Sequence, residues 1–220
     1  MKYKCLVLDH DDTVVNSTAV IHYPAFLAYL DLTRPGLSSQ YSLARYFEKN
    51  FDPGITDFFT KELAMTPEEV DAEFHFWQSF VETRIPKVYP GIREILQRHV
   101  ENGGVFAVVS HSMRETILRD YRENGLPQPD LVYGWELPPA QRKPNPWPLQ
   151  RIMDTFGLQP QEMLMVDDLK PGYDCARACG VPFAAAGWAY DVPGIEAFMR
   201  RNCDHYFKTV DALSDFLQDE

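Results

Sequence analysis

The chain has 220 residues, of which 45% are hydrophobic and 24% are charged, and its formal net charge is −11. This composition is typical of a soluble globular protein, and the length suits one large domain or a core with an insertion. The negative charge disfavours nucleic-acid binding, because phosphate backbones require clustered Lys and Arg. No apolar run reaches 18 residues and the first one is too short for a signal peptide, so we expect a cytoplasmic protein without a membrane span.

The first predicted strand ends in a cluster of carboxylates. Residues 5–8 are apolar enough for a strand buried on both faces, and Asp9, Asp11 and Asp12 follow directly. Asp9 and Asp11 are two residues apart, so they point the same way on an extended backbone. Clustered carboxylates repel one another unless a cation lies among them, and Mg²⁺ prefers oxygen ligands. The segment suggests a metal site at the carboxyl end of a parallel strand, and a simple polar turn is the alternative.

From residue 20 to about 84 the pattern changes to helical periodicity with many aromatic residues. Breaks that contain Pro or Gly fall at 33–36, 52–54 and 66–67. Thr66 followed by Pro67 and Glu69 is typical of a helix start, with Thr66 as the N-cap. We predict an all-helical insertion of four or five short helices, whose aromatic side chains mostly form its own core.

After residue 88 strands and helices alternate. The predicted strands are 105–109, 131–133, 163–166, 182–186 and 205–207, and the predicted helices are 92–100, 112–124, 147–156, 173–178, 195–202 and 210–217. This alternation predicts an α/β fold with a doubly wound, Rossmann-like parallel sheet. We expect an α/β core domain at 1–15 and 88–220 and a helical cap domain at 16–87.

Polar residues follow other predicted strands as well. Ser110 and His111 follow strand 105–109, the pair Asp167-Asp168 follows strand 163–166, and Lys143 precedes helix 147–156. A parallel sheet gathers such positions on one edge. One hydroxyl, one ammonium and several carboxylates suit phosphoryl transfer, in which a phosphate needs a cation and hydrogen-bond donors while a carboxylate attacks phosphorus.

Taken in order, these motifs resemble the haloacid dehalogenase (HAD) superfamily, in the subgroup with a helical cap after the first motif, which includes phosphoglycolate phosphatases and β-phosphoglucomutases. The matching segments are Asp9-His10-Asp11-Asp12-Thr13, Ser110, Lys143 in Lys-Pro-Asn-Pro, and Asp167-Asp168. The chain departs from the family at Asp12, where Gly is usual. Asp tolerates a left-handed backbone better than most residues, so the turn can still form.

The resemblance implies a HAD-like phosphoric monoester hydrolase. It would be a Mg²⁺-dependent phosphatase of a small phosphorylated metabolite, working through an aspartyl-phosphate. Asp9 would be the nucleophile, and Asp11 the general acid and then the base. Lys143 and Ser110 would complete the catalytic set, and both would bind the phosphate together with the amide of His111.

The resemblance also implies a Mg²⁺ site formed by Asp9, the backbone carbonyl of Asp11, Asp167 and Asp168. Asp168 would bind the metal directly or through water, or it would instead only orient Lys143.

In similar proteins a loop between cap helices selects the substrate. The candidate here is the segment 51–57, with Asp52, Pro53, Gly54 and Ile55 as the predicted specificity residues. This segment contains no Lys or Arg, so a second anionic group would need Lys49, Lys61 or a core residue. That disfavours a small diacid such as phosphoglycolate.

Other polar residues near the motifs have simpler expected roles. We expect His10 to point away from Asp9, His111 to line the substrate side, and Asn16 and Ser17 to cap the first cap helix.

Four alternatives share the same fold. A phosphosugar mutase has the same core motifs, a phosphonate hydrolase would use a cap lysine such as Lys49 or Lys61, and a dehalogenase is disfavoured by Asp11. A non-catalytic HAD-like binding protein is the fourth. The expected partner is the small metabolite alone, in a monomer or homodimer.

Overall fold

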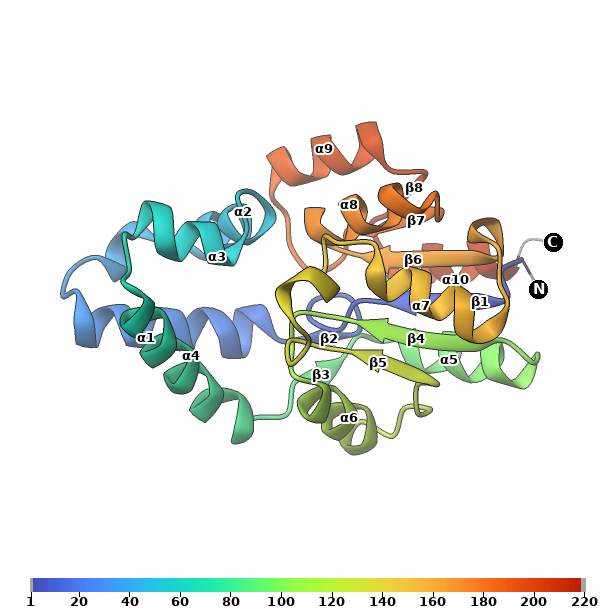
Figure 1. Ribbon diagram of the computed structural model, residues 1–220, viewed down its shortest axis with the longest axis horizontal. Coiled ribbons are helices and arrows are strands. Elements are labelled where there is room, and N and C mark those ends of the chain that lie inside the picture. Colours follow the sequence, from blue (N-terminus) through green and yellow to red (C-terminus); the bar gives the residue numbers. More distant parts are fainter. Residues whose placement is uncertain (1, 219–220) are drawn as a thin grey trace.

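The computed structural model describes residues 2–218, which form a parallel sheet with helices on both faces and a helical layer beyond one end of it (Figure 1). Within these residues the main sheet has six strands in the order β5-β4-β1-β6-β7-β8, and every neighbouring pair is parallel. This confirms the predicted α/β class. The strands are β1 (Cys5–Leu8), β4 (Val105–Val109), β5 (Leu131–Tyr133), β6 (Met163–Asp167), β7 (Phe183–Ala186) and β8 (His205–Phe207).

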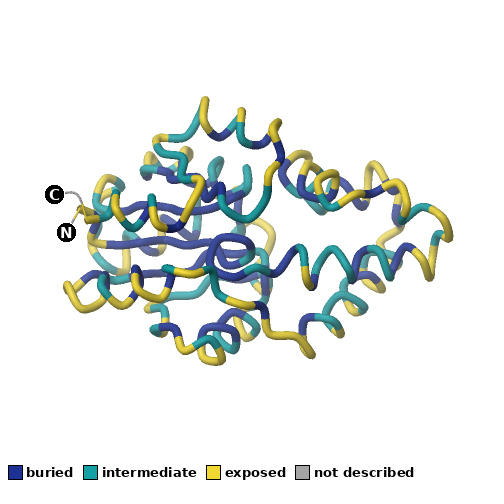
Figure 2. Tube along the Cα trace, turned by 180° about the vertical axis from the view of Figure 1, so that it is seen from behind, coloured by how far each residue is buried: buried dark blue, intermediate teal, exposed yellow. Residues whose placement is uncertain are grey.

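Side-chain alternation along β1 divides the core into two halves. Leu6 and Leu8 belong to one hydrophobic cluster, whereas Cys5 and Val7 belong to the cluster on the opposite face. All four side chains are buried, and the sheet is the darkest part of the tube in Figure 2. The first cluster packs against α5 (Ile92–Glu101), α6 (Arg114–Glu123) and α10 (Val210–Gln218), and the second against α7 (Trp147–Phe156), α8 (Lys170–Cys179) and α9 (Pro193–Asn202).

The strand register brings the predicted motifs to one edge. Leu8 of β1 pairs with Val108 of β4 and with Val166 of β6. The residues that follow each strand therefore leave the sheet at a similar height, at the carboxyl edge. This edge faces the helical layer, and the start of β1 and the end of α10 lie at the opposite end of the sheet (Figure 1).

The helical layer has its own aromatic core. Phe26, Tyr46, Phe58 and Phe59 are among its buried residues, as the aromatic density of the segment predicts. The Thr66–Glu69 capping box is present at the start of the longest helix. The elements are η1 (Thr18–His22), α1 (Tyr23–Thr33), η2 (Ser38–Gln40), α2 (Leu43–Phe51), α3 (Ile55–Asp57), η3 (Phe58–Glu62) and α4 (Pro67–Glu82).

The two connections between the sheet and the helical layer pair with each other. Strands β2 (Val15–Asn16) and β3 (Lys87–Val88) form a short antiparallel ribbon, with Val15 opposite Val88. A strand of two residues has no detectable alternation, so the sequence pattern did not predict this ribbon. Its presence means that the chain enters and leaves the helical layer at one place.

Most boundaries of the predicted elements lie within a few residues of those observed. Helix α8 begins at Lys170, three residues before the predicted start, because Pro171 in its first turn needs no N–H partner. Two short 3₁₀ helices, η4 (Pro139–Gln141) and η5 (Pro160–Glu162), were not predicted. Among residues 2–218 no helix combines the length and the apolar character needed to cross a membrane.

Candidate active site

Lys143 joins two of the strand-end carboxylates. Its Nζ lies 2.8 Å from Asp9 Oδ1 and 2.6 Å from Asp167 Oδ2, and all three side chains are buried. Burial opposes the charge on Lys143, but the two carboxylates raise its pKa above the ordinary value. The lysine is therefore a fixed cation beside Asp9, as phosphate binding would require.

Three buried carboxylates converge at this point. Asp9, Asp167 and Asp168 each offer an oxygen within 4.8 Å of the others. Burial, followed by repulsion from nearby carboxylates, raises the pKa of Asp168, and burial likewise raises the pKa of Asp167 to about 7 despite the contact with Lys143. One ammonium cannot neutralise three carboxylates, so this donor set fits a divalent cation that prefers oxygen ligands, such as Mg²⁺.

The adjacent acids Asp167 and Asp168 have different partners. Asp167 contacts Lys143, whereas Asp168 accepts a hydrogen bond from Thr13 Oγ1 at 3.3 Å. The contact that orients Lys143 is thus made by Asp167, and the alternative that assigned it to Asp168 is wrong. Helix α8 approaches closely here, and a Cβ on Gly172 would overlap the Asp167 carboxylate. Glycine at this position allows the first turn of α8 to pack on the acid.

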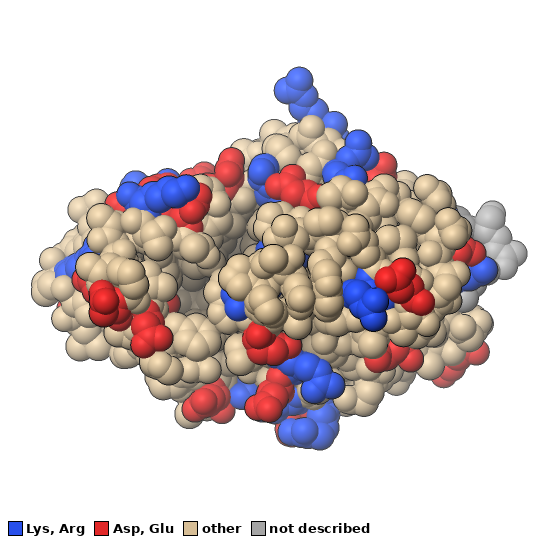
Figure 3. Space-filling view, in the orientation of Figure 1, with Lys and Arg blue, Asp and Glu red and all other residues tan. Residues whose placement is uncertain are grey.

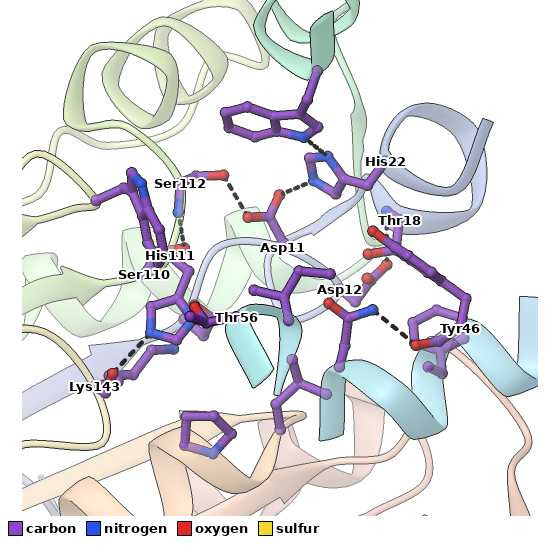
Figure 4. Close-up of a pocket in the computed structure, with 18 of the residues that line it drawn as sticks. Asp11, Asp12, Thr18, His22, Tyr46, Thr56, Ser110, His111, Ser112 and Lys143 are labelled. Atoms are coloured by element: carbon purple, nitrogen blue, oxygen red, sulfur yellow. Dashed lines mark hydrogen bonds and ion pairs between the residues drawn. The ribbon is translucent and has the colours of Figure 1, made fainter. Parts of the chain in front are cut away.

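Three donors surround the Asp11 carboxylate. Ser112 Oγ donates to Oδ2 at 2.6 Å and His22 Nε2 lies 2.9 Å from Oδ1 (Figure 4). Ser17 Oγ donates to Oδ1 at 2.6 Å. Burial alone would raise the pKa of Asp11, but His22 and then Ser112 lower it below the ordinary range. The Ser17 hydroxyl therefore donates to Asp11 and makes no capping hydrogen bond to the first helix, so the expectation that its side chain caps this helix is wrong.

His22 is held by a second bond from the helical layer. The indole Nε1 of Trp77 lies 2.8 Å from His22 Nδ1. An indole N–H can only donate, so Nδ1 accepts and the proton of the neutral imidazole lies on Nε2, facing Asp11. This chain of bonds links α4 to the carboxylate that follows β1.

Asp12 occupies a left-handed turn. Its φ is 58°, a conformation that Asp adopts more easily than most residues other than Gly. Its Oδ1 accepts a long hydrogen bond from the Thr18 backbone N–H at 3.4 Å. Burial, assisted by the charge of Asp11, raises the pKa of Asp12 to about 7. The turn thus forms as expected despite the absence of the usual Gly.

Ser110 and His111 lie beside Lys143. Ser110 is buried, and its Oγ accepts from the Ser112 backbone N–H at 3.2 Å. His111 Nε2 lies 3.0 Å from the Lys143 backbone carbonyl, so it donates there. Burial, assisted by the charge of Lys143, lowers the pKa of His111 to about 4. His111 is thus a neutral residue that fixes the Lys143 loop.

His10 points away from the site, as expected. Its ring is buried, and Nε2 lies 3.1 Å from Asp120 Oδ2 on α6. The ring also stacks on Tyr121. Its contacts therefore tie the turn after β1 to the core helix α6.

A cavity of about 270 Å³ opens between the sheet edge and the helical layer. In Figure 3 the surface is hollowed between these two parts of the molecule. Asp9, Asp11, Asp12, Ser110, His111, Lys143 and Asp168 line its floor. The structure therefore brings the predicted strand-end residues to one cavity, with Asp167 beneath it in contact with Lys143.

The walls of the cavity differ from the prediction. Of the four predicted specificity residues only Ile55 lines the cavity; Asp52 and Pro53 are exposed, and Gly54 is not part of the lining. Residues 52–54 of this loop therefore lie outside the cavity lining. The loop does supply Thr56, which follows Ile55 in α3.

Much of the opposite wall comes from α4, which sequence reasoning missed. Val70, Glu73, Phe74 and Trp77 line the cavity, and these four residues have the i, i+3, i+4, i+7 spacing of one helix face. That spacing was visible in the sequence, but it is equally typical of a face that packs into a core. His22 was also missed, because it lies in no motif.

The chain matches a known protein family over most of its length, and similar proteins and structures exist. Residues 6–186 match the family described as haloacid dehalogenase-like hydrolase. A pyrophosphatase PpaX of Halalkalibacterium halodurans is 24% identical over 99% of this chain and 98% of its own length. A phosphoglycolate phosphatase of Haemophilus influenzae is 26% identical over 89% of this chain and 92% of its own. The crystal structure of a predicted phosphoglycolate phosphatase from Haemophilus somnus superposes with a TM-score of 0.75 at 19% identity, covering 99% of each chain.

Proposed function

Because the chain belongs to the haloacid dehalogenase-like hydrolases, we propose that it is a Mg²⁺-dependent phosphatase of a small phosphorylated metabolite, acting through an aspartyl-phosphate on Asp9. The observation that carries the proposal is the contact of Lys143 with both Asp9 and Asp167, at the floor of a cavity large enough for a small organic phosphate. Two relatives are named as a pyrophosphatase and a phosphoglycolate phosphatase, and these names support hydrolysis of a phosphate compound.

In the first step the Asp9 carboxylate attacks phosphorus and the bond to the leaving oxygen breaks. Lys143 and Ser110 lie where they can bind the phosphoryl oxygens. Mg²⁺, held by Asp9, Asp167, Asp168 and the Asp11 carbonyl, would offset the repulsion between the nucleophile and a phosphate dianion. These metal ligands and phosphate contacts are part of the proposal.

Asp11 is proposed to transfer the proton in both steps. Three donors hold its carboxylate and favour the ionised form, which is the form that accepts a proton from water during hydrolysis of the aspartyl-phosphate. The first step needs Asp11 protonated, to donate to the leaving oxygen. A bound phosphate dianion favours that form, because a nearby negative charge raises the pKa of a carboxyl group.

We further propose that residues 16–87 form a cap domain that closes over this site, with the β2–β3 ribbon as its hinge. The lining of the cavity by η1, α2, α3 and α4 supports this role.

The test is phosphate release from a panel of phosphorylated metabolites and an aryl phosphate, with and without Mg²⁺. We expect release that requires Mg²⁺ and that falls at least about 10³-fold in Asp9→Asn, since the covalent step is lost. The control is Asp71→Asn, which makes the same change at an exposed position of α4. Wild-type rates in a folded Asp9→Asn variant, or no release from any panel member by the folded, Mg²⁺-loaded protein, would contradict the proposal.

A further inference from the structure

Glu73 is a buried carboxylate without a protein partner. It lies on α4, its residue exposure is 9%, and it lines the cavity from the side of the helical layer. Within residues 2–218 no protein group donates a hydrogen bond to its carboxylate or pairs with it, and its oxygens are not among the fully enclosed unpaired atoms, so they reach the cavity. A carboxylate held in this way can pair with a cationic group that enters the cavity.

The neighbours of Glu73 do not supply that partner. Burial, and then the charge of Glu73, raises the pKa of the Tyr46 hydroxyl, so the two groups are within electrostatic reach. Asn50 uses one of its two amide N–H groups to donate to the Tyr46 backbone carbonyl at 2.8 Å, which leaves the second N–H as a donor and Oδ1 as an acceptor. Both residues line the cavity. His22 is also nearby, but its two ring nitrogens are engaged with Asp11 and Trp77.

Aromatic residues form the rest of this wall. The rings of Phe47, Phe59, Phe74 and Trp77 line the cavity around the polar groups. An apolar wall with hydrogen-bond acceptors in it is suited to an organic group that has an apolar body and a polar donor at its end.

The charges around the cavity favour a cation over a second anion. Lys143 is the only Lys or Arg among the described lining residues, and it is already paired with two carboxylates. The two cap lysines that a second anion would need are engaged elsewhere: Lys49 Nζ lies 2.6 Å from Glu62, and Lys61 Nζ lies 2.7 Å from Asp57. Neither lysine lines the cavity.

We propose that Glu73 binds an ammonium group on the organic part of the substrate, and that the enzyme acts on amine-bearing phosphate monoesters. Lys143 would bind the phosphate at the floor and Glu73 the ammonium at the opposite wall, with the aromatic rings around the body between them. This inference deepens the proposed function and rests on it.

The test uses three aryl phosphates that differ only in the para substituent: aminomethyl, hydroxymethyl and carboxylate. For the native enzyme with Mg²⁺, we expect kcat/KM to be at least about tenfold higher for the aminomethyl compound than for the hydroxymethyl compound, with the carboxylate compound lowest, because an ionic hydrogen bond exceeds a neutral one by this order. Equal values for the three compounds, or a preference for the carboxylate, would overturn the inference.

The isosteric variant Glu73→Gln isolates the charge of the side chain. We expect it to bring the aminomethyl and hydroxymethyl compounds within about twofold of each other, mainly through KM. Glu82→Gln makes the same change at an exposed position of the same helix and should keep the native preference. Loss of the preference in both variants would assign it to the general charge of α4 and would overturn the specific role of Glu73.

A binding measurement tests the role of Glu73 independently of the proposed phosphatase reaction. Asp9→Asn with Mg²⁺ is titrated with the same three compounds by calorimetry. Tighter binding of the aminomethyl compound, lost with the added Glu73→Gln change, supports the role of Glu73 even if the native enzyme hydrolyses none of them. If the native enzyme hydrolyses all three compounds but the Asp9→Asn variant binds them with equal affinity, the proposed phosphatase activity stands and the role of Glu73 is overturned.

Discussion

At the scale of single residues, the groups around a carboxylate determine the direction of its pKa shift. Asp11 is a half-buried carboxylate and Glu73 a buried one beside the same cavity, yet they have opposite pKa shifts. His22 and Ser112 lower the pKa of Asp11, whereas burial raises the pKa of Glu73 to about 7. The number of donors around each carboxylate decides the direction.

The raised pKa of Glu73 predicts a pH dependence of stability. The unfolded chain releases this proton near the ordinary value of 4.5, but the folded protein keeps it until about pH 7. Between these values the folded state binds more protons, so the contribution of Glu73 to the free energy of unfolding falls as pH rises and is lowest above pH 7. The groups that face it are His22 on η1, Tyr46 on α2 and Tyr29 on α1.

Glu73→Gln removes this titration. Relative to the native protein, the variant should gain stability between pH 5 and pH 8, by at most about 3 kcal/mol for a shift of this size. Denaturant unfolding of both proteins at the two pH values, in EDTA so that no Mg²⁺ is bound, measures the gain. A stability difference that is the same at both pH values would show that Glu73 ionises in the folded protein as it does in the unfolded chain.

At the scale of elements, the first turn of α8 packs against Asp167 and so restricts the position of this carboxylate. Gly172→Ala would place a Cβ against the Asp167 carboxylate, so either α8 or Asp167 must move. We expect a loss of stability of about 1–3 kcal/mol from overpacking, and a fall in kcat of about tenfold or more as the Asp167–Lys143 contact is disturbed.

Gly194→Ala on α9 is the matched control. Its added Cβ would meet nothing within 4 Å, so stability and kcat should stay near the native values or stability should rise slightly. Thermal unfolding and steady-state rates measure both effects. Native behaviour of Gly172→Ala would mean that α8 adjusts without cost and that Gly172 has no special role.

The sequence predicted helices and strands well where the hydrophobic periodicity agreed with the positions of Pro, Gly and capping residues. Strand β1 and the capping box at Thr66 were both readable, because each depends on residues adjacent in the chain. The floor of the cavity was predicted for the same reason, since parallel strand ends share one edge. The walls of the cavity were not predicted, because apolar residues have the same spacing on a helix face that lines a cavity as on one that packs into a core. Thus α4 was assigned to the cap core, and the outward loop at Asp52 was given the specificity role.

In the whole molecule, Arg119 connects the two parts. From α6, its guanidinium donates to the backbone carbonyls of Val81 and Glu82 at 3.0 and 3.2 Å and to that of Arg84 at 3.0 Å, where the chain leaves α4. It also pairs with Asp120, the residue that holds His10. One side chain thus contacts the return linker and, through Asp120, the turn after β1.

We expect Arg119→Ala to loosen this linker. Amide hydrogen exchange of residues 81–88 should increase and KM should rise severalfold. The core strands should keep their protection, because the lost bonds are those to residues 81, 82 and 84 and to Asp120 on α6, and none is made to a strand of the sheet. Arg122→Ala on the same helix is the control, since Arg122 is exposed and, in the described part of the chain, its side chain pairs only with Glu123. Unchanged exchange at 81–88 in the Arg119 variant would show that the ribbon alone fixes the linker.

The β2–β3 ribbon has a consequence for chain connectivity. Val15 and Val88 are paired neighbours, so the core is interrupted in sequence but not in space. The entropy of closing the intervening loop is offset by the ribbon, by the aromatic core of the insertion and by α2, whose Phe47 and Phe51 pack against the core. Because the insertion supplies no strand to the main sheet, it can lengthen, shorten or be exchanged for another insertion without changing the strand order. Selection on the substrate can then act on one part of the chain while the floor of the site is preserved.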